Sequence, residues 1–433
     1  MSTLSLGNVD AGVSFDASTF LARYHANLPL AKAKTQFRDE GNNQWKDFAV
    51  TNGSDVRALQ QFLHNAGFLP KEDMVDGIFG YATQAAVRLF QEYVRTIEKI
   101  DMTPDGVVGG GTQAQIQRWQ DNGLKCEWAT WSKDNPSPEY TQWLSLLGKA
   151  KDHFKANGSE ILELINQHRK KFGVCDTRII DEWDVSNNTV HLIGLRQGEE
   201  AAVQADFKGR FRRANDDLFV FLINGMVFKF WGSTDPNPPE AKNSKGNPFL
   251  IEGQHNYQFG WHKINLSKKE KEAGLSAGYK VYRALRPATK GVLVYRVPDA
   301  GGLTAAEVAG GIDPESNTTI NIHWSGAGDY NQSAGCQVIA GRSYINHKGE
   351  LVNCSKYAAT SYDELGTDRV TKKWKGRGAY NVFTDLLLSY GPSKVLTIAY
   401  TLGRDETLRL ADNPQWKDAN FVRDTVKRMM DVQ

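Results

Sequence analysis

Two Asp-Gly turns, each followed by a helix-like segment, recur in the first third of the chain. Asp76–Thr83 reads DGIFGYAT, and Asp105–Thr112 reads DGVVGGGT 29 positions later. An Asp-Gly pair forms a tight turn, the glycine permits a positive φ, and threonine can cap the next helix. The segments that follow also end alike, in LFQ at Leu89–Gln91 and in RWQ at Arg118–Gln120. The repeat therefore predicts helix–turn units in tandem.

A third amphipathic helix precedes the two turns, with Ser54 placed as its N-cap. Its apolar residues share one helical face: Val56, Leu59, Phe62 and Leu63. Three helices joined by two Asp-Gly turns, with Gln60 and Gln91 near helix ends, resemble the peptidoglycan-binding three-helix module. The resemblance covers residues 51–122 and implies that peptidoglycan, through its glycan strands and stem peptides, is the partner. The alternative is a small bundle with Asp-Gly linkers and no wall ligand.

The composition limits the class of protein. A chain of 433 residues is too long for one compact core, and 40% hydrophobic with 24% charged residues is typical of folded domains. The net charge of +2 provides no basic excess to neutralise phosphates, which argues against nucleic acid as a partner. Four scattered cysteines without a Cys-x-x-Cys pair indicate neither a disulfide framework nor a zinc site. No metal and no cofactor are predicted.

The first ten residues have neither a basic start nor an apolar run, so no secretory signal is predicted. No stretch reaches the roughly 18 apolar residues that a membrane span requires. We therefore expect synthesis in the cytoplasm and no membrane span. An action outside the cell would then need another route of delivery.

Changes in composition divide the chain into four parts. We expect an N-terminal extension at 1–50, the peptidoglycan-binding module at 51–122, a helical linker at 123–173 and a catalytic domain at 174–433. Helices are expected at 17–25, from Pro138 behind a Ser137 cap to about Phe172 with breaks, and at 380–390. Strands are expected at 189–195, 218–223, 226–230, 279–285, 292–297, 319–323, 336–340 and 395–400. The fold class predicted is multidomain α + β, with a three-helix bundle followed by a mainly-β, sandwich-like domain.

A histidine and a cysteine stand close together in the β-rich part. His323 ends an apolar segment, a glycine-rich turn follows, and Cys336 comes 13 positions after the histidine. A thiol needs a base to react at neutral pH, and histidine is the usual one. Gly335 allows a tight turn whose N–H groups can bind an oxyanion, and Ser333 can brace that turn. The competing interpretation is a buried cysteine that acts only as a small hydrophobic residue.

This order of histidine, glycine-rich loop and Ser-x-Gly-Cys looks like the L,D-transpeptidase catalytic domain, over residues 174–402. The resemblance implies Cys336 as nucleophile, His323 as base, and the backbone carbonyl of Trp324 as the group that orients the imidazole. Ala334 and Val338 stand where the family has histidine and arginine or asparagine, so the binding of the substrate carboxylate departs from the family pattern. Three more residues are predicted to bind substrate: Gln254, His255 and Tyr282.

Together these features predict a cysteine enzyme that acts on peptidoglycan stem tetrapeptides as an L,D-carboxypeptidase, an L,D-transpeptidase or a D-amino-acid exchange enzyme. We expect it to work in the periplasm of a target bacterium as an antibacterial effector, with a secretion-machine component and an immunity protein as further partners. The alternatives are a phage endolysin or a non-catalytic wall-binding or tail protein. A metallo-hydrolase is a further alternative, although no His-Glu-x-x-His motif is present.

Overall fold

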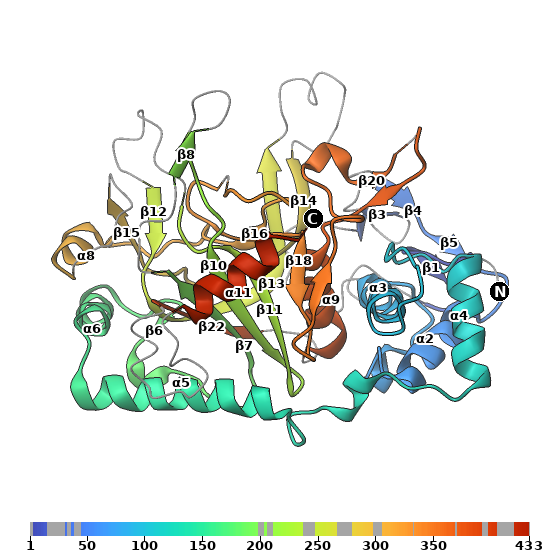
Figure 1. The fold of residues 1–433 in the computed structure, drawn as a ribbon, viewed down its shortest axis with the longest axis horizontal. Coiled ribbons are helices and arrows are strands. Elements are labelled where there is room, and N and C mark those ends of the chain that lie inside the picture. The colour runs from blue at the N-terminus through green and yellow to red at the C-terminus, as the bar shows by residue number, and fades with distance from the viewer. Residues whose placement is uncertain are drawn as a thin grey trace. The chain divides into compact units, whose positions relative to one another are not determined.

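The computed structural model describes residues 3–14, 31–32, 36–38, 45–197, 203–205, 211–236, 247–265, 279–297, 305–331, 333–368, 370–391, 397–404 and 420–432 (Figure 1). The helix predicted at 17–25 lies outside these residues. Contacts divide the chain into two compact units. The first unit comprises Met1–Ser132, Phe259–Ala284 and Ser361–Leu396, and the second comprises Lys133–Gln258, Leu285–Thr360 and Thr397–Gln433. Each unit brings together segments that are distant in sequence.

Three helices of the first unit lie where the repeat predicts them. They are α2 (Asp55–Ala66), α3 (Tyr81–Thr96) and α4 (Gly110–Asp121), shown in blue and cyan in Figure 1. Aromatic side chains from these helices and from the segments that follow α2 and α4 form their common core: Phe62, Phe68, Phe90, Tyr93, Trp119 and Trp128. Most of the rings meet edge to face, as aromatic pairs prefer. The N-terminal region is therefore helical around one aromatic cluster.

The two Asp-Gly turns are held by the same hydrogen bonds from the preceding helix. Gln60 Nε2 donates to Asp76 Oδ1 at 2.8 Å, and Gln60 Oε1 accepts from the backbone N–H of Gly77 at 2.8 Å. Gln91 repeats this arrangement one unit later, with Asp105 Oδ1 at 3.0 Å, Gly106 N at 2.8 Å and Thr112 Oγ1 at 3.1 Å. The glutamines that recur in the sequence thus satisfy buried polar groups of the turns.

The start of the chain is part of the first unit. Strand β1 (Asn8–Val9) pairs in parallel with β5 (Ala49–Val50). Asp10 caps α2, since its two carboxylate oxygens accept from the N–H groups of Val56 and Arg57, both at 2.8 Å. Ser54 makes no such bond, so the predicted cap is wrong. The helix N-terminus is satisfied instead by a residue more than forty positions upstream, which local sequence patterns do not reveal.

Helix α9 (Ala379–Tyr390) forms at the predicted place and packs against α3. A buried ion cluster joins the two helices, because Asp385 accepts from Arg88 Nε at 2.8 Å and from Arg283 Nη1 at 2.6 Å. The remaining elements of this unit are short: β2 (Ala31–Lys32), β3 (Gln36–Arg38), β4 (Trp45–Asp47), η1 (Glu72–Met74), η2 (Glu127–Thr130), η4 (Tyr362–Glu364), β20 (Gly366–Thr367) and β21 (Trp374–Lys375).

The second unit begins with two helices, α5 (Pro138–Asn157) and α6 (Glu160–Phe172). Ser137 caps α5 as predicted, with its Oγ accepting from Tyr140 N at 3.2 Å. Helix α5 and the C-terminal helix α11 (Phe421–Met430) cover the strands β10 and β11 through one apolar cluster. Members of that cluster from the two helices and the two strands include Trp143, Leu147, Leu218, Trp231, Val426 and Met429.

One mixed sheet dominates the β-rich region, in the order β10-β7-β22-β13-β14-β16-β17-β11-β18-β19. These strands are β7 (Val190–Arg196), β10 (Asp217–Ile223), β11 (Met226–Ser233), β13 (Gly253–Asn265), β14 (Tyr279–Pro287), β16 (Ile322–Trp324), β17 (Gln337–Ile339), β18 (Ser343–Ile345), β19 (Leu351–Asn353) and β22 (Thr397–Arg404). Because β10 also pairs with β11, the sheet closes on itself. It is barrel-like rather than the predicted sandwich, since alternation in sequence predicts strands but not their closure. Residues 259–265 of β13 and residues 279–284 of β14 belong to the first unit.

The smaller described elements of the second unit are β6 (Thr177–Arg178), η3 (Ile180–Glu182), β8 (Val203–Ala205), β9 (Phe211–Arg213), β12 (Asn247–Leu250), β15 (Val294–Val297) and α8 (Ala305–Gly311). Of these seven, β15 lies in the predicted strand 292–297, and the other six were not predicted. No helix in the described part of the chain is long and apolar enough to cross a membrane.

Candidate active site

The parallel strands β16 and β17 bring His323 and Cys336 to one face of the sheet. Their register pairs Ile322 with Gln337 and His323 with Val338. Cys336, just before β17, therefore lies beside Asn321 and faces the same side as His323. A ring nitrogen of His323 and the Sγ of Cys336 lie within 4.8 Å of each other. The structure thus brings together the histidine and the cysteine that the sequence pattern pairs.

The imidazole of His323 is buried, with 8% of its surface exposed. Its Nδ1 lies 2.9 Å from the carbonyl oxygen of Trp324. A carbonyl can only accept, so Nδ1 carries the proton and Nε2 is the acceptor end of the neutral ring. Burial lowers the pKa of His323 to about 4, and the bond to Trp324 offsets part of that effect. At neutral pH the ring is therefore an uncharged base.

The Cys336 thiol is partly exposed and sits between two backbone groups. Sγ donates to the carbonyl of Thr319 at 3.3 Å and accepts from the N–H of Asn321 at 3.3 Å. Burial raises the pKa of Cys336, while the Asn321 N–H, Ser333 and the charge of Arg286 lower it in part. A protonated thiol beside a neutral imidazole is consequently the resting state at pH 7.

The turn before Cys336 depends on a close approach of the backbone. A Cβ on Gly335 would lie 2.5 Å from Cγ of Pro248, so any other residue would push the turn away. The N–H of Gly335 donates to Ser333 Oγ at 3.4 Å, and the N–H of Ser333 donates to Asn331 Oδ1 at 2.6 Å. Ser333 therefore contributes to the turn through its hydroxyl and its backbone. Asn331 anchors it further by donating to the carbonyl of Asp235 at 2.6 Å.

Arg286 is a charged neighbour of this pair that sequence reasoning missed. Strand β14 pairs with β16 antiparallel, with Leu285 opposite Ile322. Arg286 is therefore opposite Asn321, and Arg286, Asn321 and Cys336 form one row across three strands. The positive charge of Arg286 lowers the pKa of the Cys336 thiol. In the sequence Arg286 only follows an apolar strand, and nothing there links it to a cysteine fifty positions later.

Two residues predicted to bind substrate are instead part of the sheet. Gln254 is fully buried, and its Nε2 donates to the Asp184 carbonyl at 2.8 Å and to Thr401 Oγ1 at 3.1 Å. His255 is also fully buried, with Nε2 bonded to the Ile251 carbonyl at 2.9 Å and Nδ1 to Thr177 Oγ1 at 3.0 Å. These bonds occupy both ring nitrogens of His255, so the prediction that the two residues bind substrate is not supported by the structure.

Tyr282, the third predicted substrate-binding residue, belongs to the first unit. It is 1% exposed, and its hydroxyl accepts from Tyr362 at 2.9 Å. The Arg377 guanidinium lies 4.7 Å from the centre of its ring. These contacts give Tyr282 a packing role within that unit.

His323 and Cys336 could together offer two ligands to a metal ion. Imidazole nitrogen and thiolate sulfur both bind zinc and related ions. The sequence predicts no metal, and the effect of a chelator on activity would separate a cysteine mechanism from a metal-dependent one.

Comparison with known proteins bears on the N-terminal region. Residues 52–96 match the model of a family described as a putative peptidoglycan binding domain. This segment contains α2, the first Asp-Gly turn and α3, so the match falls on the first repeat. Peptidoglycan binding and an association with the cell wall are therefore supported for this chain. A search of curated proteins finds no match.

Among solved structures, the chain is similar to a fused Zn-dependent amidase/peptidase/peptidoglycan-binding domain-containing protein from Clostridium acetobutylicum. The identity is 12%, the alignment covers 81% of this chain and 96% of that one, and the TM-score is 0.20. At that TM-score the likeness carries no weight for the fold or the chemistry.

Proposed function

We propose that the chain is a cysteine enzyme that cleaves or exchanges the terminal D-alanine of peptidoglycan stem tetrapeptides. The observation that carries this proposal is the Cys336 thiol within 4.8 Å of a neutral imidazole whose proton is held on Nδ1. The match of residues 52–96 to a peptidoglycan-binding family supports the choice of substrate.

The first half of the reaction forms an acyl-enzyme. The substrate carbonyl, between the third residue and D-alanine, is attacked by the sulfur of Cys336. The thiol releases its bond to the Thr319 carbonyl and its proton passes to His323 Nε2. The C–N bond then breaks, and the imidazolium returns that proton to the leaving amine of D-alanine. The backbone N–H groups of Gly335 and Cys336 are the proposed donors to the oxyanion, with Gly335 releasing its bond to Ser333.

The second half resolves the thioester. Water attack releases a tripeptide, attack by a D-amino acid gives exchange, and attack by another stem amine gives a cross-link. In each case His323 takes a proton from the incoming nucleophile, and the sulfur leaves as the protonated thiol. The thiol is not pre-ionised, since its pKa is raised and that of His323 is lowered. Proton transfer must therefore accompany each attack.

Arg286 supplies a charge for the substrate's terminal carboxylate. It lies in the same row as Cys336 and is partly exposed. The family pattern places an arginine or asparagine after the cysteine, where this chain has Val338. An arginine on a neighbouring strand can reach the same carboxylate, because guanidinium groups bind carboxylates in a bidentate manner.

The proposal is tested by incubating the full chain with stem tetrapeptide and following D-alanine by mass spectrometry. We expect release or exchange in the wild type and none in Cys336→Ala, with no effect of a chelator. Loss of activity on chelation, with Cys336→Ala still active, would establish metal chemistry instead. No reaction in any variant would leave the alternative of a non-catalytic wall-binding protein.

The antibacterial role predicted from the sequence adds one further expectation. Export of the chain to the periplasm of a test bacterium should slow growth, and Cys336→Ala should abolish that effect. Normal growth with active protein present would remove this part of the proposal without touching the chemistry.

A further inference from the structure

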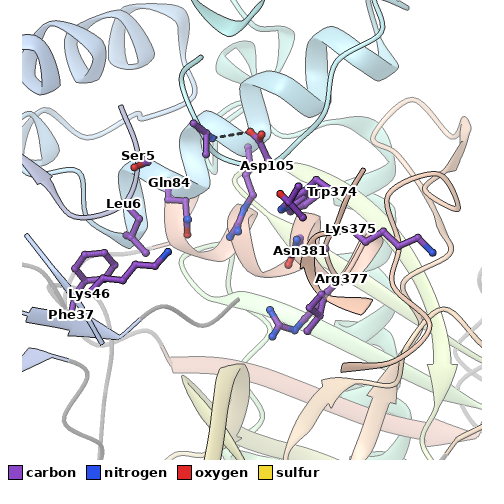
Figure 2. Close-up of a pocket in the computed structure, with 16 residues that line it drawn as sticks. Ser5, Leu6, Phe37, Lys46, Gln84, Asp105, Trp374, Lys375, Arg377 and Asn381 are labelled. Atoms are coloured by element: carbon purple, nitrogen blue, oxygen red, sulfur yellow. Dashed lines mark hydrogen bonds between the residues drawn. The ribbon is translucent and has the colours of Figure 1, made fainter. Parts of the chain in front are cut away.

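The first unit contains a cavity of about 380 Å³ beside the β20–β21 hairpin, here named the hairpin cavity. Its walls come from the repeat helices, from the N-terminal strands and from residues 365–381 (Figure 2). Figure 2 shows Lys46 and Phe37 on one side and Trp374 and Lys375 on the other, with Gln84 in between. The volume is in the range of pockets that bind small ligands.

The lining of the hairpin cavity is strongly basic. Among its described residues are four basic side chains, Lys46, Arg88, Lys375 and Arg377, and one acidic side chain, Asp105. The Asp105 carboxylate already accepts from Gln91 and from the backbone of Val107. Its pKa is raised, chiefly by burial. The single acid of the lining is thus used by the second Asp-Gly turn. Lys375 pairs with Glu364 at 3.1 Å and Arg88 with Asp385 at 2.6 Å. The basic side chains still outnumber the acidic ones when these two carboxylates are counted, so the cavity favours an anion.

A buried ion cluster holds one of the four bases in place. Arg88 and Arg283 share one carboxylate, that of Asp385, and both arginines are at least nine-tenths buried. Gln84, which lines the cavity, accepts from Arg283 through its Oε1 at 2.8 Å.

An aromatic wall accompanies the charges. Gly376 lets the Trp374 indole lie close to the backbone, since a Cβ there would be 2.3 Å from Cη2 of Trp374 and 2.7 Å from Nδ2 of Asn381. Phe37 faces the cavity from the other side. Flat aromatic faces suit the apolar face of a sugar ring. Carboxylate-binding groups with aromatic walls are therefore combined in one cavity.

We propose that the hairpin cavity binds a carboxylate-bearing muropeptide unit, with the sugar against Trp374 and the carboxylate near Lys46. This inference rests on the peptidoglycan part of the proposed function, but not on the chemistry of Cys336. It assigns wall recognition to a cavity that residues 365–381 help to build, and not to the residues 52–96 alone. The reaction at Cys336 and the binding of the chain to the cell wall then depend on different residues.

Calorimetric titration of the full-length Cys336→Ala chain tests this inference. The probe is a disaccharide dipeptide from peptidoglycan, which lacks the bond that Cys336 is proposed to attack. Lys46→Gln should raise its Kd about fivefold or more, and added salt should weaken binding. Lys125→Gln, an exposed lysine in the same unit and outside the cavity, should leave Kd within about twofold.

Two further arms identify the source of the binding energy. A neutral N-acetylglucosamine dimer should bind at least about tenfold more weakly than the disaccharide dipeptide, because it carries no carboxylate. Trp374→Ala should weaken both probes. Equal binding of the two probes, or an unchanged Kd in Lys46→Gln and in Trp374→Ala, overturns the inference.

The outcome is separable from that of the catalytic proposal. The Lys46→Gln variant with Cys336 intact should still release D-alanine from soluble tetrapeptide at the wild-type rate. If binding fails while this release persists, only the hairpin cavity is refuted. If D-alanine release is absent in the wild type while binding behaves as described, only the catalytic proposal is refuted.

Discussion

Nδ1 of His323 lies 2.9 Å from the carbonyl oxygen of Trp324, the next residue in the chain. This bond fixes the tautomer and leaves Nε2 as the acceptor. Because the partner is a backbone atom, the arrangement does not depend on the tryptophan side chain. It depends on the local path of β16 and on the burial that keeps the ring neutral.

The pH profile should reflect the low pKa of His323. Burial lowers that pKa to about 4, so the base is unprotonated well below neutral pH. We expect kcat/KM for D-alanine release to stay level from pH 7 to about 5 and to fall with a midpoint near 4. A midpoint near 6.5, the value of an exposed histidine, would contradict the buried neutral base.

Substitutions at the two adjacent positions should have very different effects. Trp324→Phe keeps the carbonyl and a large apolar ring, so kcat should change by less than about threefold. His323→Gln removes the base and should lower kcat about 10²- to 10⁴-fold. Circular dichroism and thermal melts of both variants control for folding. A similar loss of kcat in both would mean that the tryptophan side chain, and not the carbonyl, is needed.

Arg286→Gln should weaken substrate binding. We expect KM for the tetrapeptide to rise about tenfold with kcat reduced little, since a charge-assisted hydrogen bond contributes about 1.5–3 kcal/mol. Arg286→Lys keeps the charge and should recover part of the loss, and a substrate with an amidated terminus should be indifferent to both changes. An unchanged KM in Arg286→Gln would remove this residue from substrate binding.

The two glutamines of the repeat should contribute comparably to stability. Gln60→Ala and Gln91→Ala each leave buried N–H and C=O groups of an Asp-Gly turn without their partner, at a cost of about 1–3 kcal/mol per group. Gln61→Ala, on the exposed side of α2, should cost less than about 0.5 kcal/mol. Denaturant melts of the full chain measure this. An equal loss of unfolding free energy in Gln60→Ala and Gln61→Ala would show that the turn does not need its glutamine.

Acid should destabilise the second unit through His255. Its pKa is lowered to about 3 by burial, against about 6.5 in an unfolded chain. Between these values the unfolded state binds more protons, so stability is fully present above pH 6.5 and is lost as the pH falls towards 3. His255→Gln should flatten this dependence in melts from pH 7 to 4.5. The same slope in wild type and variant would exclude His255 as a cause.

Local patterns in the sequence predicted the helices of the repeat, the cap at Ser137 and the eight strands, because each depends on neighbours within a few residues. The cap at Asp10, the closure of the barrel by β10 and β11, and the row that contains Arg286 depend on pairing between distant segments. The sequence did not predict β13, because polar residues such as Gln254 and His255 break the apolar pattern of a buried strand. Inside the sheet these side chains are buried and hydrogen-bonded. The pairing of His323 with Cys336 could be predicted because a short loop connects two adjacent strands.

The proposed mechanism requires that Cys336 carries the acyl group. Incubation with stem tetrapeptide, quenching in acid and peptide mapping by mass spectrometry would locate any thioester, with Cys126, Cys175 and Cys354 as internal controls. We predict a tripeptide adduct on Cys336 alone, and much less of it in His323→Gln. D-alanine release without an adduct on Cys336, or an adduct on one of the other cysteines, would rule out Cys336 as the nucleophile.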